Sequence, residues 1–94
     1  MKWRLIITPK VQEDLRDLSP QIRQYIRASL EELRKDPWLG KALKDELVGF
    51  YSFRVKHFRI VYEIQGHVIT VVVVGVGRRE SIYEELTAEL RSKR

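Results

Sequence analysis

The chain has 94 residues, one third of them charged, and a formal net charge of +5. A single domain of this length buries roughly 60–65% of its extended-chain surface in one modest core. The absence of cysteine excludes disulfides and thiolate chemistry. His57 and His67 have no partners at metal-ligand spacing, so we expect neither a metal site nor a cofactor.

The charge and the apolar runs bear on partners and location. A net positive charge favours a polyanionic or acidic partner. The longest apolar run, Val68–Val76, is interrupted by Thr70 and is too short to span a bilayer. Charged Lys10, Glu13 and Asp14 follow the first apolar run too closely for a signal peptide. We therefore expect a cytoplasmic domain without membrane contact.

A strand and two capped helices are predicted in the N-terminal half. Trp3–Thr8 is a β-rich run. Thr8-Pro9 and Ser19-Pro20 each combine an N-cap with proline at the first helical position. Apolar residues at helical spacing follow the caps: Val11, Leu15, Leu18, Ile22, Ile26, Leu30 and Leu33. Asp36-Pro37 ends the second helix, and the helices predict a hairpin covering one sheet face. Trp38–Glu46 is interpreted as a connecting loop, with Trp38 as a lid on the core edge.

Three consecutive strands are predicted between Leu47 and Tyr83. Apolar and polar residues alternate in Phe50–Lys56 and in Phe58–Ile64, the period of half-buried strands. If Lys56-His57 is a two-residue loop, three apolar pairs share one face: Tyr51 with Tyr62, Phe53 with Ile60 and Val55 with Phe58. Lys-His is a poor pair for a type I′ turn, so a longer loop and another register stay open.

The same register places two arginines on the polar face of this hairpin. Arg54 lies opposite Arg59, where like charges destabilise a sheet, so the pair indicates an anion-binding site. Arginines placed on a surface strand for solubility are the alternative. Either Arg78 or Arg79 joins this face from the third strand. A two-residue turn near Gly66 favours Arg78, and a three-residue turn favours Arg79.

A final helix is predicted after Gly75 and Gly77, which either let the backbone approach a ligand or end the strand. Ser81 and Glu84 match a capping box with Ser81 as the N-cap. Three apolar residues form one stripe of this helix: Ile82, Leu86 and Leu90. The element order is β-α-α-β-β-β-α. It predicts an α+β domain with helices segregated to one side of a small, mostly antiparallel sheet.

Two motifs, following the helical hairpin, resemble the RelE/ParE toxin superfamily. Gly49–Ile64 reads G-x-Y-x-x-x-V-x-x-x-R-I-V-Y-E-I, and Val76–Tyr83 reads V-G-x-R-x-x-x-Y. The resemblance covers nearly the whole chain in element order. It implies a single RelE-like toxin domain over residues 1–94.

Such a resemblance implies the toxin half of a prokaryotic type II toxin–antitoxin pair. RelE-type members are endoribonucleases that cut messenger RNA in the ribosomal A site. ParE-type members lack the nuclease residues and poison DNA gyrase. The implied partners are a RelB-like antitoxin with an acidic-amphipathic segment, the ribosome with its mRNA, and operator DNA bound only as the toxin–antitoxin complex. The nuclease is the leading hypothesis. The gyrase toxin and an inactive antitoxin-binding or operator-binding relative are the alternatives.

The resemblance also implies the residues of the site. The catalytic set is Arg54, Arg59, Arg79 and Tyr83. The arginines would hold the scissile phosphate, and the tyrosine would stack on a base or transfer a proton. Ser52 stands where a well-studied branch of the family has lysine.

Secondary candidates for RNA binding or catalysis lie close to this set: Ser52, Lys56, His57 and Arg78. Lys56 would compensate for the uncharged Ser52 and serve as a base, with His57 as a second candidate base. Some relatives have histidine where this chain has Arg78. The antitoxin is expected to cover the basic face or to displace the last helix, Ser81–Leu90. The implied contacts on that helix are Ile82, Leu86 and Leu90.

Overall fold

Strands β3 (Phe50–Val55) and β4 (Phe58–Gln65) form the central hairpin of the structure, a computed structural model that describes residues 2–93. Lys56 and His57 form a two-residue loop, in which Lys56 adopts a left-handed φ of +55°. The register is the predicted one: Val55 with Phe58, Arg54 with Arg59, Phe53 with Ile60 and Tyr51 with Tyr62. The period-two pattern therefore predicted this hairpin correctly, despite the unfavourable Lys-His turn.

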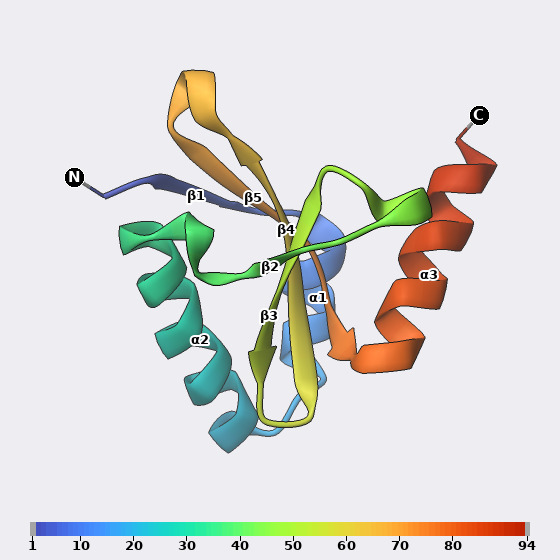
Figure 1. Ribbon diagram of the computed structural model, residues 1–94. Helices are drawn as coiled ribbons and strands as arrows, with labels where there is room; N and C mark the ends of the chain where they lie inside the picture. The colour runs from blue at the N-terminus through green and yellow to red at the C-terminus, as the bar shows by residue number, and fades with distance from the viewer. Residues whose placement is uncertain (1, 94) are drawn as a thin grey trace.

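The sheet has five strands in the order β1-β5-β4-β3-β2 (Figure 1). β5 (Thr70–Arg78) pairs antiparallel with β4, and β1 (Arg4–Ile7) pairs parallel with β5. The strand β2 (Lys41–Ala42) pairs antiparallel with β3, inside the stretch predicted to be a loop. The α+β class and the mostly antiparallel sheet are confirmed, and the predicted element order lacked this one short strand.

A bulge in β5 changes which of its residues lie opposite β4. Tyr62 pairs with Val73 and Val61 pairs with Gly75, so the register skips Val74. The loop before β5 spans residues 66–69, so the predicted turn of two or three residues was wrong. A four-residue loop alone would place Val76 opposite Arg59. The bulge shifts the second half of β5 by one residue and places Gly77 there instead.

Helices α1 (Pro9–Arg16) and α2 (Pro20–Lys35) cover one face of the sheet. Both predicted N-caps are confirmed. Thr8 Oγ1 accepts a hydrogen bond from the Val11 N–H at 3.4 Å, and Ser19 Oγ accepts one from the Ile22 N–H at 3.3 Å. Helix and strand side chains form one buried cluster: Val11, Ile26, Leu30, Leu33, Val55, Ile60, Tyr62, Val71, Val73 and Val76. The predicted apolar stripes therefore form the main core.

Helix α3 (Arg79–Ser92) packs on the other face of the sheet, as Figure 1 shows. The expectation that all helices lie on one side was therefore wrong. Ile82 and Leu86 are buried against Val61 and Leu47 in a second cluster. Val61 points to this face because it alternates with the residues that α1 and α2 cover.

The start of α3 also differs from the prediction. The N-cap is Arg78, without a side-chain cap, so Ser81 lies inside the first turn rather than at the cap. The reason is tertiary packing. A Cβ atom on Gly75 would lie 2.8 Å from Ile82 Cδ1, and one on Gly77 would lie 3.3 Å from Ile82 Cβ. The two glycines bring the backbone of β5 close to Ile82, and α3 begins directly after the strand.

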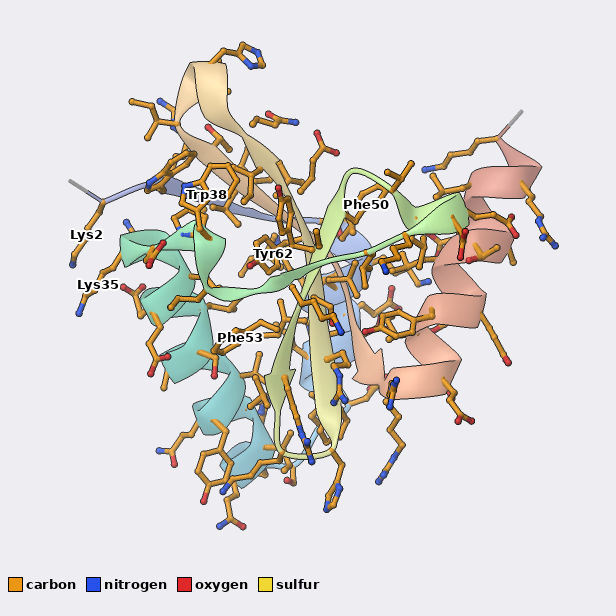
Figure 2. All side chains as sticks on the ribbon, in the orientation of Figure 1. Lys2, Lys35, Trp38, Phe50, Phe53 and Tyr62 are labelled. Carbon is orange, nitrogen blue, oxygen red and sulfur yellow. The ribbon has the colours of Figure 1, made fainter. Side chains whose placement is uncertain are left out.

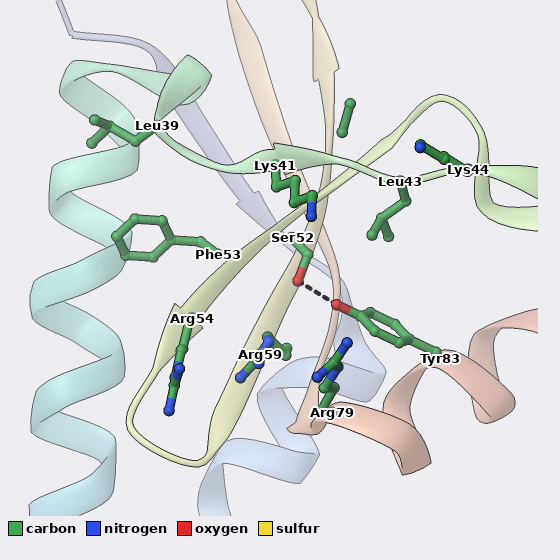
Figure 3. A pocket seen from close by; sticks show the side chains of 11 residues that line it. Leu39, Lys41, Leu43, Lys44, Ser52, Phe53, Arg54, Arg59, Arg79 and Tyr83 are labelled. Carbon is green, nitrogen blue, oxygen red and sulfur yellow. Dashed lines mark hydrogen bonds between the residues drawn. The ribbon is translucent and has the colours of Figure 1, made fainter.

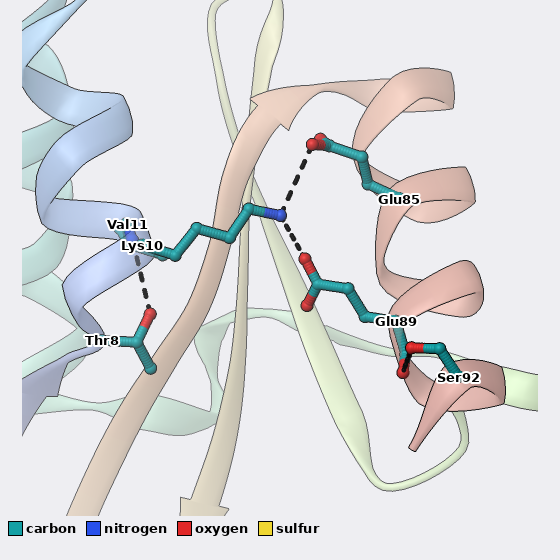
Figure 4. A network of polar contacts seen from close by, with 6 residues as sticks. All are labelled: Thr8, Lys10, Val11, Glu85, Glu89 and Ser92. Atoms are coloured by element: carbon teal, nitrogen blue, oxygen red, sulfur yellow. Dashed lines mark hydrogen bonds and ion pairs between the residues drawn. The ribbon is translucent and has the colours of Figure 1, made fainter. Parts of the chain in front are cut away.

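Ion pairs connect α3 to neighbouring elements. Lys10 on α1 contacts Glu85 at 3.4 Å and forms a close ion pair with Glu89 (Figure 4). The hydrogen bond from Lys10 to Glu89 raises the pKa of Lys10 above its ordinary value. Exposed pairs of this kind contribute about 0–1 kcal/mol. The apolar contacts beneath the helix are therefore the larger contribution to its docking.

The segment that carries β2 is held against the sheet by one buried tyrosine. Tyr62 on β4 donates a hydrogen bond to the Pro37 carbonyl at 2.7 Å and accepts one from the Gly40 N–H at 3.0 Å. Burial raises the pKa of Tyr62 to about 12, so the phenol is neutral at physiological pH. Trp38, labelled in Figure 2, is 59% exposed. It packs edge-on against Trp3 and Tyr51, as expected of a lid on the core edge.

Candidate active site

A groove of about 630 Å³ opens between β2, the β3–β4 hairpin and the first turn of α3 (Figure 3). Five of its lining residues are cationic: Lys41, Lys44, Arg54, Arg59 and Arg79. Within residues 2–93, no carboxylate lines the groove and none of these five side chains has an ion pair. The groove is therefore a concentration of uncompensated positive charge that suits an anionic ligand.

Arg54 and Arg59 contribute two of these charges from directly opposite positions on β3 and β4. Arg54 Nε donates to the Lys56 carbonyl at 3.3 Å, and Arg59 Nη1 donates to the Phe58 carbonyl at 3.3 Å. Neutral carbonyls orient the guanidinium groups but leave their charge uncompensated. Most of their N–H donors remain available for an anion.

The structure places Arg79 in the groove and directs Arg78 elsewhere. Arg79 follows two residues after Gly77, the partner of Arg59, so it comes to the same side of the sheet. Arg78 pairs with Phe58 across the strands, and its guanidinium lies 5.4 Å from the centre of the Phe58 ring. The bulge at Val74 is the reason, because without it Arg78 would have shared the face of Arg59.

Tyr83 completes the set from the first turns of α3, four residues after Arg79 and on the same side of the helix. Its phenol oxygen lies 2.8 Å from Ser52 Oγ, a hydrogen bond in which either oxygen can donate (Figure 3). Ser52 is buried, with 7% of its surface exposed. Ser52 thus holds the phenol of Tyr83 in place from across the groove.

Lys56 and His57 do not line the groove. The Lys56 ammonium lies 4.6 Å from the centre of the Tyr25 ring on α2, a cation–π contact on the helical side. His57 is exposed at the tip of the hairpin. The expectation that Lys56 replaces a cation missing at Ser52 was wrong, since the left-handed conformation of Lys56 turns it toward α2.

Sequence reasoning missed Lys41 and Lys44. They lie in the stretch interpreted as a loop, where a two-residue strand gives no periodic signal. Lys41 is the cross-strand partner of Ser52, so both side chains lie on the face that forms the groove. The sequence offered only Lys41 directly after Gly40 and Lys44 three residues later, in the segment between Asp36 and β3.

The three apolar residues predicted to contact an antitoxin belong to the inner side of α3. Ile82 and Leu86 are buried, and Leu90 packs beside them. A smaller apolar groove of about 220 Å³ lies between this helix and the sheet, with Leu47, Phe50 and Leu90 in its wall. Leu86 also lines this groove, so a partner that enters it reaches Leu86 and Leu90 with α3 in place. Ile82 does not line it and is buried, so a partner reaches Ile82 only if α3 moves away from the sheet.

Two further findings concern the described part of the chain, residues 2–93. It contains no group of three His, Cys, Asp or Glu side chains placed to hold a metal ion. None of its helices is long and apolar enough to cross a membrane.

Comparison with known proteins assigns the chain to a family. The sequence model of the ParE toxin of the type II toxin–antitoxin system parDE matches residues 5–83. The chain therefore belongs to the RelE/ParE superfamily of type II toxins, as its two motifs predicted.

Individual relatives agree with this assignment. Toxin RelG of Mycobacterium tuberculosis is 32% identical over 85 residues, covering 88% of this chain and 98% of that protein. The toxin–antitoxin complex RelBE2 of M. tuberculosis contains a chain with 30% identity and a TM-score of 0.77, over 84% of this chain and 100% of that one. A mutant of Escherichia coli toxin RelE in the free state gives a TM-score of 0.78 at 21% identity, over 97% and 98% of the two chains, and supports the fold.

Proposed function

We propose that this toxin is a ribosome-dependent endoribonuclease that cleaves messenger RNA in the A site and so inhibits translation. The observation that carries the proposal is the groove in which three arginines and one tyrosine meet without a carboxylate among residues 2–93. A polyanion that must come close to several cations at once fits this groove.

The reaction that the groove supports is transfer of the phosphoryl group to the ribose 2′-oxygen. The 2′-oxygen loses its proton and bonds to phosphorus, the bond to the 5′-oxygen breaks, and that leaving oxygen takes up a proton. Arg54, Arg59 and Arg79 would stabilise the charge on the phosphorane, a contribution that typically amounts to about 10²–10³ in rate for one donor. Tyr83 would stack on a base or transfer a proton.

A weak acid–base set is consistent with dependence on the ribosome. Neither candidate base of the turn, Lys56 or His57, faces the groove. An enzyme with cations and one phenol gains most from a substrate that another particle holds in a reactive geometry, because orientation alone contributes about 7–11 kcal/mol in favourable cases.

Primer extension on a defined message in a reconstituted translation reaction, with and without ribosomes, tests the proposal. The wild type should cut within codons only when ribosomes are present. The triple variant Arg59→Ala, Arg79→Ala, Tyr83→Ala should not cut. A matched variant with two arginines and one tyrosine replaced on α2, Arg23→Ala, Tyr25→Ala, Arg27→Ala, should retain activity. Growth arrest by the first triple variant in cells would refute the nuclease assignment.

Inhibition of DNA gyrase is the second candidate function, favoured by the ParE description of the matching family model and by the uncharged Ser52. A gyrase supercoiling assay separates the two. Inhibition of supercoiling that survives the triple replacement, with no RNA cleavage, would favour gyrase.

We also propose that a RelB-like antitoxin with an acidic-amphipathic segment neutralises this toxin and that the complex represses its own operon. The complexes formed by relatives and the charge of the groove support the proposal. The segment would either cover the groove or displace α3 and contact Ile82, Leu86 and Leu90. Hydrogen exchange on the complex should change in the groove or in α3, and an unchanged pattern at both would refute it.

A further inference from the structure

Two lysines on β2 and the turn after it form a separate part of the groove. Lys41 and Lys44 line the wall formed by β2 and the turn after it, while Arg54, Arg59 and Arg79 lie around the end of the hairpin (Figure 3). Both lysines are exposed and have no ion pair within residues 2–93. No described contact within the protein accounts for their charge at this position.

The sheet register sets the spacing between this wall and the arginines. Lys41 lies directly across from Ser52, and Arg54 follows two residues later on the same face of β3. Diagonal neighbours of this kind are about 7–8 Å apart at their backbones. Both side chains are long, so their charged ends can contact different groups of one extended ligand rather than the same oxygen atoms.

The wall is also held in place from beneath. Tyr62 fixes the backbone at Pro37 and Gly40, directly before Lys41, through two hydrogen bonds of 2.7 and 3.0 Å. A Cβ atom on Gly40 would lie 2.1 Å from the Tyr62 phenol oxygen, so this approach requires glycine. The lysines therefore project from an ordered support, which lowers the entropic cost of binding a ligand with them.

We propose that Lys41 and Lys44 form a second phosphate-binding subsite, which holds the RNA phosphate next to the scissile one. The ligand is an RNA segment longer than one nucleotide, with its scissile phosphate at the three arginines. A groove of about 630 Å³ is within the size range that accommodates more than a single small group. This subsite rests on the nuclease function proposed above.

The test measures how fast the double variant Lys41→Ala, Lys44→Ala cleaves messenger RNA bound to ribosomes under single-turnover conditions. The double variant should lose about 10- to 100-fold in kcat/KM, less than an oxyanion-hole donor because both lysines are exposed. The charge-preserving variant Lys41→Arg, Lys44→Arg should stay within a few-fold of wild type. The control variant Lys2→Ala, Lys35→Ala also loses two positive charges, but these lie away from the groove (Figure 2). It should cleave at the wild-type rate. Thermal unfolding followed by circular dichroism shows whether all variants are folded.

Messages with a neutral methylphosphonate at either linkage beside the scissile phosphate identify the group that the lysines bind. At one of these linkages the modification should slow the wild type and have little further effect on Lys41→Ala, Lys44→Ala. Full activity of that double variant, or equal slowing of both proteins at both linkages, would overturn the subsite. Absence of cleavage by the wild type would instead refute the nuclease function itself.

Discussion

At the scale of single residues, buried hydroxyl groups organise the groove from below. Ser52 fixes the phenol of Tyr83, and the phenol of Tyr62 fixes the segment that carries Lys41. Each of these hydrogen bonds connects two segments that are distant in the sequence. The positions of Tyr83 and Lys41 in the groove therefore depend on these contacts.

Replacing Tyr62 by phenylalanine should lower the free energy of unfolding by about 1–3 kcal/mol, because the Gly40 N–H and the Pro37 carbonyl lose their partner. The pKa of Tyr62 is raised from 10.0 to about 12 by burial, so the folded state favours the protonated phenol. The stabilisation linked to that proton is complete below pH 10 and is lost as the pH rises to about 12. Urea unfolding of both proteins from pH 7 to pH 12 should show the difference shrinking in this window. A constant difference would contradict the assignment.

At the scale of elements, the contact between β5 and α3 determines where two groove residues lie. Arg79 and Tyr83 are both on the first turns of α3, and Ile82 between them packs on the glycines of β5. A change in the distance between the strand and the helix therefore moves both groove side chains together.

Gly75→Ala should destabilise the protein by about 1–3 kcal/mol, because the new methyl group would lie 2.8 Å from Ile82 Cδ1 and 3.0 Å from Leu86 Cδ1. RNA cleavage should fall with it if Arg79 and Tyr83 act from α3. Adding Ile82→Val removes the clashing Cδ1 atom, so the double variant should lose less stability than the sum of the two single losses. If chemical denaturation showed that the losses in unfolding free energy of the two single variants simply add in the double variant, the clash with Ile82 Cδ1 would not be the cause.

At the scale of the whole molecule, the net charge can be compared with the number of cations in the groove. The chain has 18 Lys and Arg residues and 13 Asp and Glu residues, and five of the cations line the groove. The remaining chain therefore carries equal numbers of positive and negative side chains. The net charge of +5 equals the charge of the groove residues.

We expect the salt dependence of single-stranded RNA binding to come mainly from the groove, because its five cations lie together with no carboxylate among the lining residues that the structure describes. If all five cations contact phosphates, the plot of log affinity against log salt should have a slope of about −3.5 for a non-cleavable 2′-O-methyl oligonucleotide. Replacing Arg54 and Arg59 by alanine should reduce this slope by about 1.4, and replacing Arg23 and Arg27 should not change it. Fluorescence anisotropy at several salt concentrations measures the slopes. Equal slopes for the two variants would place the RNA elsewhere on the surface.

Local patterns predicted the hairpin register, both proline-associated helix caps and the meeting of Arg54 with Arg59. Tertiary contacts determined what the sequence did not reveal. The start of α3 follows the packing of Ile82 on β5 rather than the capping-box pattern at Ser81. The wall with Lys41 exists because a buried phenol 22 residues from Gly40 holds a strand too short to have a period.

The extra residue in β5 affects how relatives are compared. Which of two adjacent arginines enters the groove is decided by the number of residues between the end of β4 and the start of α3, not by residue type. A relative with one insertion or deletion in this stretch would present the neighbouring side chain to the groove. An alignment that simply matches arginine to arginine would then equate side chains on opposite faces of the sheet.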